Sequence, residues 1–124
     1  MTTAEVLIRA KEELVTRGWC QGGYENRQTG EVCVAGAINL ATTGAVENTH
    51  LGVFGFWRAF MRGTGYPTSG VPGWNDCPGR TPEQVLATFD AAIAIALQQE
   101  RGSAETTDLH TTTSDVRGTA VVGR

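Results

Sequence analysis

The fold is decided by residues 73–85, which read Gly-Trp-Asn-Asp-Cys-Pro-Gly-Arg-Thr-Pro-Glu-Gln-Val. Thr81 and Gln84 have the spacing of a capping box, in which each side chain bonds the backbone N–H of the other residue. Pro82 stands at the first helical position, where its missing N–H costs nothing and its fixed φ suits a helix. The stretch therefore predicts a helix that begins at Pro82.

The residues before this helix predict an ordered loop. Asn75 and Asp76 are typical of turns, because their side chains bond the nearby backbone. Trp74 carries too large an apolar surface to be left in water without a cost. We therefore expect Trp74 to anchor the loop to the core, and we expect the loop to lead directly into the helix.

Four stretches in all have helical spacing. Residues 3–17 place their apolar groups on one face, with Thr2 and Glu5 spaced as a second capping box. The small apolar run that begins at Cys33 predicts a buried helix, in which Gly36 lets another segment approach the backbone closely. The predicted helices cover residues 3–17, 33–43, 50–62 and 82–102.

The third of these helices, from His50 to Arg62, follows Thr49 as its N-cap and carries a bulky aromatic face. We expect this face to pack in the core. If Phe56 and Phe60 were exposed instead, they would form a surface for a homodimer.

Two less regular stretches complete the chain. Residues 23–24 and 31–33 flank a polar turn and predict a short antiparallel β-ribbon. Residues 102–124 are rich in Thr, Ser, Asp and Gly, which predicts a flexible tail; the alternative is that residues 119–122 add a strand to a sheet edge, such as that of a partner. We expect a mainly α fold, with a compact four-helix single domain over residues 1–101 and a flexible C-terminal tail.

Composition restricts the classes of function. The chain has 124 residues, 40% of them apolar, which is enough to bury one core without disulfides or a structural metal. Its formal charge of −3 provides no basic stripe for phosphates, which argues against nucleic-acid binding. No apolar run approaches the length of about 20 residues that spans a bilayer, and the N-terminus lacks the pattern of a signal peptide. We expect a cytoplasmic protein with reduced cysteines.

The side chains that bind zinc are present in Cys20, Cys33, Cys77 and His50. Structural zinc sites usually contain close pairs such as Cys-x-x-Cys, and no such pair occurs in this sequence. Buried free cysteine is an ordinary small core residue. The sequence therefore predicts no metal site, and it indicates no other cofactor.

A cysteine-dependent hydrolase or transferase is one alternative. Cys20, with His50 and either Asn75 or Asp76, would supply the nucleophile, the base and the orienting group. Cys20 follows a helix C-terminus, where the helix dipole raises the pKa of a thiol rather than lowering it. Cys33 starts a helix, but its apolar neighbours indicate burial. Because no known nucleophile signature flanks these cysteines, we expect a protein that is not an enzyme.

Two loops of similar composition form the candidate ligand site. Each loop places an indole beside short polar groups, so the two together would line one pocket with a polar mouth. The favoured interpretation is that the polar side chains satisfy the ends of neighbouring helices, as buried polar groups must. The candidate ligand-binding residues are Trp19, Cys20, Gln21, Trp74, Asn75 and Asp76.

Three separated motifs stand out. They are Gly-Trp-Cys-Gln-Gly at 18–22, Cys-Val-Ala-Gly-Ala at 33–37 and Trp-Asn-Asp-Cys-Pro-Gly-Arg-Thr at 74–81. Together they resemble an uncharacterised family of small proteins from actinobacteria and their phages. The resemblance covers roughly residues 4–98. It implies a small helical domain in a bacterial or phage-infected cytoplasm, and it implies no catalytic role.

The sequence thus favours a non-enzymatic interaction protein. We expect a protein partner, which would be a host protein if the chain is encoded by a phage, and we expect neither nucleic acid nor a membrane as a partner. One alternative is a small-ligand-binding protein that uses the Trp19 and Trp74 loops. The other alternative is the cysteine-dependent enzyme.

Overall fold

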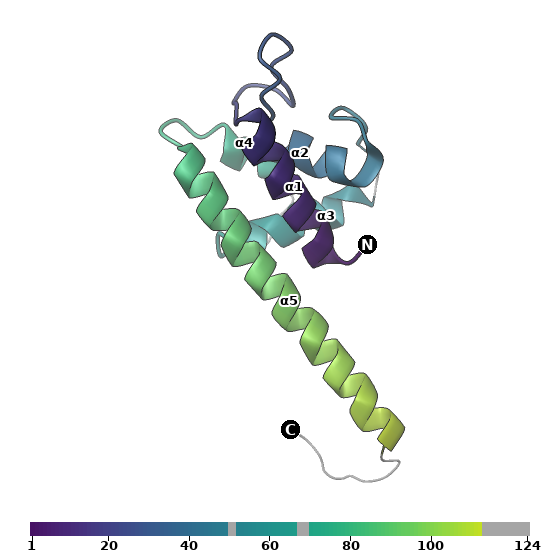
Figure 1. Ribbon diagram of the computed structural model, residues 1–124. Coiled ribbons are helices and arrows are strands. Elements are labelled where there is room, and N and C mark those ends of the chain that lie inside the picture. Colours follow the sequence, from purple (N-terminus) through teal and green to yellow (C-terminus); the bar gives the residue numbers. More distant parts are fainter. Residues whose placement is uncertain (50–51, 67–69, 113–124) are drawn as a thin grey trace.

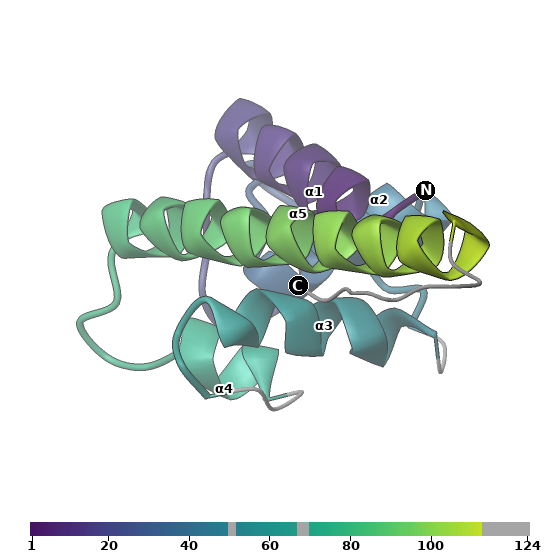
Figure 2. The ribbon, with the colours of Figure 1, turned by 90° about the horizontal axis from the view of Figure 1, so that it is seen from below.

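The computed structural model describes residues 1–49, 52–66 and 70–112, with side chains up to residue 102. This part of the chain is mainly helical, as predicted. Its five helices are α1 (Thr3–Arg17), α2 (Val34–Thr43), α3 (Val53–Arg62), α4 (Val71–Asn75) and α5 (Pro82–Thr112). The long α5 lies against α1 and α3, and its C-terminal end extends beyond the other helices (Figures 1 and 2). None of the described helices is both long and apolar enough to cross a membrane.

The core lies where α1, α2, α3 and α5 meet. Leu7 and Leu14 of α1 are buried there, as are Val85 and Phe89 of α5. Phe60 of α3 packs edge-to-face on Phe89, with ring centroids 4.7 Å apart. The apolar faces expected from helical spacing therefore meet in this core.

The two ends of α1 are closed by the expected residues. The Thr2 hydroxyl accepts a hydrogen bond from the Glu5 N–H at 3.1 Å, and the Glu5 carboxylate accepts one from the Thr2 N–H at 2.7 Å. Gly18 follows the last turn with a φ of 91°, which favours glycine. A third cap comes from α5, because the Glu100 carboxylate accepts from the Ala4 N–H at 3.1 Å. This bond satisfies one of the free N–H groups in the first turn of α1.

α2 ends at Thr43, as predicted, and begins at Val34, one residue after the predicted start. Cys33 is its N-cap, with Sγ accepting a hydrogen bond from the Gly36 N–H at 3.3 Å, and Gly44 is a left-handed C-cap. A Cβ added at Gly36 would lie 2.3 Å from the carbonyl oxygen of Tyr24. The expected close approach at Gly36 is thus confirmed, and the approaching segment is the loop that precedes α2.

α3 begins later than predicted. It starts at Val53 after Gly52, and that N-cap makes no side-chain hydrogen bond. The predicted start, His50, lies outside the described residues. Thr49, the predicted N-cap, instead accepts a hydrogen bond from the Asn39 Nδ2 at 3.1 Å. Asn39 is fully buried, so its amide needs such a partner.

The loop predicted ahead of α5 contains the short helix α4, so the described part has five helices rather than four. The Trp74 N–H donates to the Gly70 carbonyl at 3.1 Å, and the Asp76 N–H donates to the Pro72 carbonyl at 3.0 Å. Pro72 lies in the first turn, where its ring is tolerated. The Gly and Pro residues that suggested a loop are therefore compatible with a single helical turn.

The predicted β-ribbon is reduced to isolated bridges. Val32 pairs with Trp19 in parallel and with Glu25 in antiparallel orientation. The Cys33 N–H also donates to the Tyr24 carbonyl at 3.1 Å. Over residues 1–49, 52–66 and 70–112 no strand is formed.

α5 starts at Pro82, as predicted, but it continues past Gly102 to Thr112. An isolated glycine costs a helix only about 1 kcal/mol relative to alanine, so Gly102 does not have to end it. The division of the chain into a domain over residues 1–101 and a tail stays a prediction. Residues 113–124, which include the alternative strand, lie outside the described residues.

Candidate functional site

The two indole-containing loops meet at Asn75. Its Oδ1 accepts a hydrogen bond from the Trp19 Nε1 at 2.7 Å, and its Nδ2 donates to the Cys20 carbonyl at 3.1 Å. Asn75 Oδ1 also accepts from the Val34 N–H, at the first residue of α2, at 3.1 Å. Asn75 is fully buried. One amide side chain therefore joins α4, the loop after α1 and the start of α2.

A second set of bonds surrounds this junction. The Gln21 Nε2 donates to the carbonyls of Asn75 at 3.0 Å and Cys77 at 3.1 Å. The Asp76 Oδ1 accepts from the Gly22 N–H at 3.1 Å and from the Asn75 Nδ2 at 3.0 Å. Polar groups of the two loops are thus paired with each other.

Trp74 anchors the junction, as the sequence led us to expect. Its half-buried ring packs edge-to-face on Phe60, with ring centroids 5.3 Å apart. The Arg80 guanidinium lies over the Trp74 ring, 4.0 Å from its centroid. The Arg80 Nε also donates a hydrogen bond to the Trp74 carbonyl at 3.0 Å. Arg80 was not among the residues predicted to form a site. The available signal was its position six residues after Trp74, in the turn that leads into α5.

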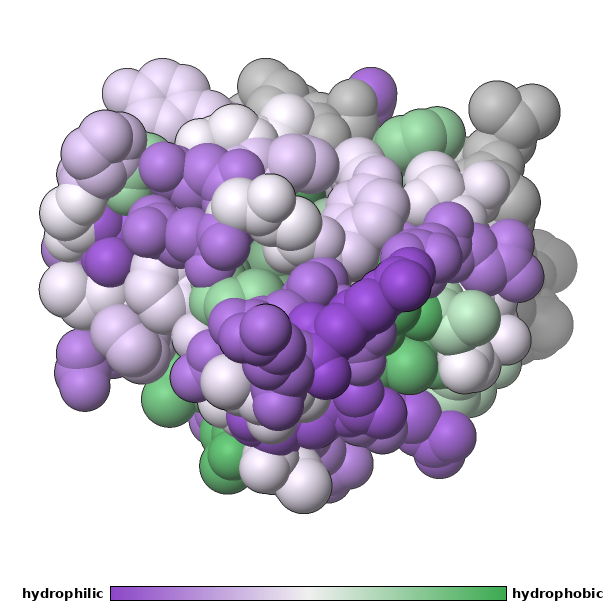
Figure 3. Space-filling view, turned by 90° about the horizontal axis from the view of Figure 1, so that it is seen from above, coloured by the Kyte–Doolittle hydropathy of each residue, from purple (hydrophilic) through white to green (hydrophobic). Residues whose placement is uncertain are grey.

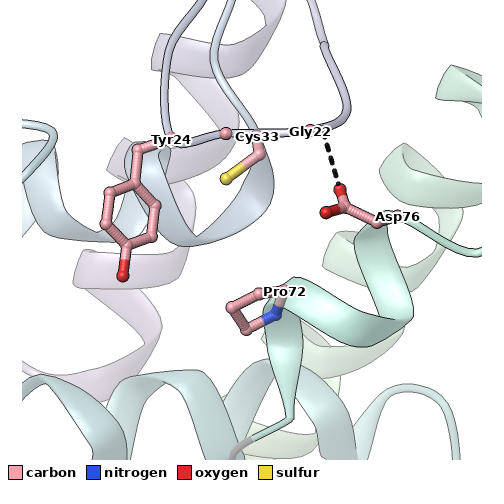
Figure 4. A pocket seen from close by; sticks show the side chains of 6 residues that line it. Gly22, Tyr24, Cys33, Pro72 and Asp76 are labelled. Atoms are coloured by element: carbon pink, nitrogen blue, oxygen red, sulfur yellow. Dashed lines mark hydrogen bonds between the residues drawn. The ribbon is translucent and has the colours of Figure 1, made fainter.

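An open hollow of about 240 Å³ adjoins the junction (Figure 4). Asp76 and Pro72 stand on the α4 side, and the loop before α2 supplies the rest of the lining. Of the six candidate ligand-binding residues, only Asp76 lines it. The lining residues are Gly22, Gly23, Tyr24, Cys33, Pro72 and Asp76.

Tyr24 and Pro72 line the hollow but were not among the candidate residues predicted from the sequence. The Gly-Gly-Tyr run at 22–24 was the available signal, because glycines leave the backbone open beside an aromatic ring. The other half of the hollow comes from α4, a helix that the sequence did not predict. The hollow therefore depends on a long-range contact that no local pattern contains.

The three thiols differ in exposure. Burial raises the pKa of the Cys20 thiol, and the nearby carboxylates of Glu31, Asp76 and Glu25 raise it further. Burial also raises the pKa of Cys33 to about 11. A nucleophilic cysteine needs the opposite shift. Cys77 is exposed.

The alternative catalytic site and the zinc site that the sequence argued against both include His50. His50, the base in the enzyme alternative, lies outside the described residues. Within the residues that the structure describes, no group of three or more His, Cys, Asp or Glu side chains is placed to hold a metal ion. Cys20 contacts backbone carbonyls instead, with Sγ 3.5 Å from the oxygen of Glu31.

The aromatic face of α3 lies mainly in the core. Phe60 is fully buried, and Phe56 is half-buried against the core. Phe60 is therefore unable to contribute to the homodimer surface that Phe56 and Phe60 would form if both were exposed. The more exposed ring on this helix is Phe54, which packs edge-to-face on Trp57.

Comparison with known proteins places most of the chain in a protein family. Residues 1–95 match the family described as "Family of unknown function (DUF6197)". No curated protein and no solved structure matches the chain significantly. The matched range includes both loops of the junction and all residues that line the hollow.

Proposed function

The chain belongs to DUF6197, a family of unknown function, and we propose that it is a non-enzymatic interaction domain that binds a protein partner at the hollow beside Asn75. We also propose that it acts in a bacterial cytoplasm. If the chain is encoded by a phage of actinobacteria, the partner would be a host protein.

The observation that carries this proposal is the internal pairing of the junction. Both polar atoms of the Asn75 side chain make two hydrogen bonds each, and the Trp19 Nε1 and Gln21 Nε2 are also used. A ligand at the junction would have to break these bonds. The candidate residues, Asp76 excepted, therefore support the fold, and recognition is left to the surface around them.

The raised pKa values of two thiols argue against the cysteine-dependent enzyme. The surroundings of Cys20 and Cys33 raise the pKa of both thiols, because burial and nearby carboxylates favour the neutral form. Cys20 also lies just after the C-terminal end of α1, where the helix dipole opposes a negative charge.

The size of the hollow favours a protein partner over a free small ligand. Pockets that enclose drug-sized molecules usually measure about 300–1,000 Å³. A volume of about 240 Å³ in an open hollow suits one side chain of a larger partner. The molecular face seen in Figure 3 is mostly hydrophilic, with hydrophobic residues in small separate areas, so a broad apolar contact is not expected there.

Site-specific photo-crosslinking tests this function. A photoreactive amino acid replaces Gly23, which is exposed beside the hollow, and a matched variant carries it at Glu83, at the start of α5. We expect the Gly23 probe to crosslink one protein that the Glu83 probe does not. That protein, once purified, should bind the unmodified chain. Equal crosslinking at both positions, or stabilisation of the chain by a metabolite in thermal-shift screening instead, would contradict the proposal.

A further inference from the structure

We infer that the hollow receives a single basic side chain, an arginine or a lysine, from the partner protein. This inference rests on the proposed function and adds the chemistry of the contact. The hollow combines one fixed carboxylate, one aromatic ring and one proline ring, and each of these favours a cationic side chain with an aliphatic stem.

Asp76 is held in place for this role. Its Oδ1 is fixed by the Gly22 N–H and the Asn75 Nδ2, at 3.1 and 3.0 Å. The second carboxylate oxygen points into the hollow (Figure 4). In the part of the chain that the structure describes, no basic group forms an ion pair with Asp76. The carboxylate is therefore oriented before binding, which lowers the cost of forming a charge-assisted hydrogen bond.

An anionic ligand is disfavoured at the same place. The start of α2 borders the hollow, but its N–H groups have internal partners: Val34 donates to Asn75 and Gly36 donates to the Cys33 Sγ. Asp76 is the one charged residue among those that line the hollow. A phosphate or carboxylate would meet this negative charge, and the Val34 and Gly36 N–H groups are already used.

The walls suit the stem of a long basic side chain. In Figure 4 the Tyr24 ring and the Asp76 carboxylate stand on opposite sides of the hollow, with Pro72 between them. An arginine or lysine stem can pack on Pro72 while its charged head reaches Asp76, and the Tyr24 ring borders the stem on the other side. Two further acidic groups, Glu25 and Glu31, lie close enough to Cys20 to raise the pKa of its thiol, and of these Glu25 is paired with Arg17 at 3.3 Å.

Capped tripeptides test the inference by NMR. The probes are N-acetyl-Gly-Arg-Gly-amide and the same peptide with citrulline, which has the shape of arginine without its charge. We expect the arginine peptide to shift the backbone amide signals of Gly22, Gly23 and Asp76. The citrulline peptide should bind about tenfold more weakly, because it loses the charge-assisted bond.

Asp76→Asn separates charge from structure. An asparagine oxygen can still accept from the Gly22 N–H, so thermal unfolding and the unliganded Gly22 signal report whether the loop is intact. This variant should lose about tenfold in affinity for the arginine peptide, whereas Glu83→Gln, which removes an exposed charge on α5, should bind normally.

Three outcomes would overturn the inference: equal binding of the two peptides, shifts confined to other residues, or no shifts at all. The proposed function is judged separately, because it depends on the crosslinking at Gly23. If that crosslinking succeeds while both peptides fail, the hollow is a protein contact that does not take a basic side chain.

Discussion

The Asn75 Oδ1 accepts a hydrogen bond from the Trp19 indole at 2.7 Å, across a separation of 56 residues. This bond fixes the loop after α1 against α4, and the same oxygen also caps the first N–H of α2. The hollow lies where these segments meet, so its shape depends on the Asn75 side chain. A substitution of Asn75 that destabilises the fold should therefore also weaken binding at the hollow.

Replacing Asn75 with alanine should destabilise the protein strongly. The change leaves the Trp19 indole N–H, the Val34 N–H and the Cys20 carbonyl without their partner. Each buried polar group left unpaired costs about 1–3 kcal/mol, so we expect a loss of about 3 kcal/mol or more in the free energy of unfolding, measured with urea. Asn48→Ala, at an exposed position, should change it by less than about 0.5 kcal/mol. A similar small effect at Asn75 would show that the junction is not a structural centre.

Gly36→Ala should be destabilising for a steric reason. The added methyl group would lie 2.3 Å from the Tyr24 carbonyl oxygen, and backbone rather than a flexible side chain has to move. We expect a loss of about 1–3 kcal/mol in urea unfolding, together with shifted amide signals around Tyr24. Gly55→Ala, in α3 with open space around it, should instead stabilise by about 0.5–1 kcal/mol. Helix propensity alone predicts that both substitutions stabilise the protein. A gain in stability for Gly36→Ala would therefore contradict the close approach of Tyr24.

Glu100→Ala should weaken the contact between α5 and α1. Its carboxylate accepts a hydrogen bond from the Ala4 N–H, so removing it leaves a first-turn donor of α1 uncapped. We expect a loss of about 1 kcal/mol in thermal or urea unfolding, the usual size of a capping contribution. Gln99→Ala is the matched control, because this neighbour is exposed. If the two variants were equally stable, the tie between the helices would be energetically unimportant.

The sequence predicted the local parts of this fold and missed the long-range ones. The limits of α1 and α2 and the start of α5 could be predicted because capping signals such as Thr81 and Gln84 act within one turn, and this capping box is present with bonds of 3.1 and 3.2 Å. α4 was missed because its Gly and Pro residues resemble a loop. The cap from Glu100 to Ala4 spans 96 residues, and no local pattern encodes it.

The candidate site was predicted in part for the same reason. The indole and short polar groups suggested that the Trp19 and Trp74 loops face each other, and the structure brings them together through Asn75. The hollow could not be predicted, because Tyr24 and Pro72 become neighbours only once α4 forms. Asp76 has both roles: one oxygen belongs to the junction and the other points into the hollow.

The buried thiol of Cys33 should make stability depend on alkaline pH. Burial raises its pKa from 9.0 to about 11 in the folded protein. Between these values the unfolded chain releases the thiol proton and the folded chain retains it, so the unfolded state binds fewer protons and the free energy of unfolding falls as pH rises. The thiol contribution is fully present below about pH 9 and is lost as the pH rises towards about pH 11, by up to about 2 kcal/mol.

Cys33→Ser isolates this effect from the titration of other groups. A serine hydroxyl can replace Sγ as the acceptor for the Gly36 N–H, and it does not ionise in this range. Urea unfolding at several pH values between about 8.5 and 11 should show a shallower decline for Cys33→Ser than for the unmodified protein. Cys77→Ser, at an exposed thiol, is the matched control for replacing a cysteine with serine. Parallel curves for Cys33→Ser and the unmodified protein would mean that Cys33 ionises as easily in the folded state as in the unfolded chain.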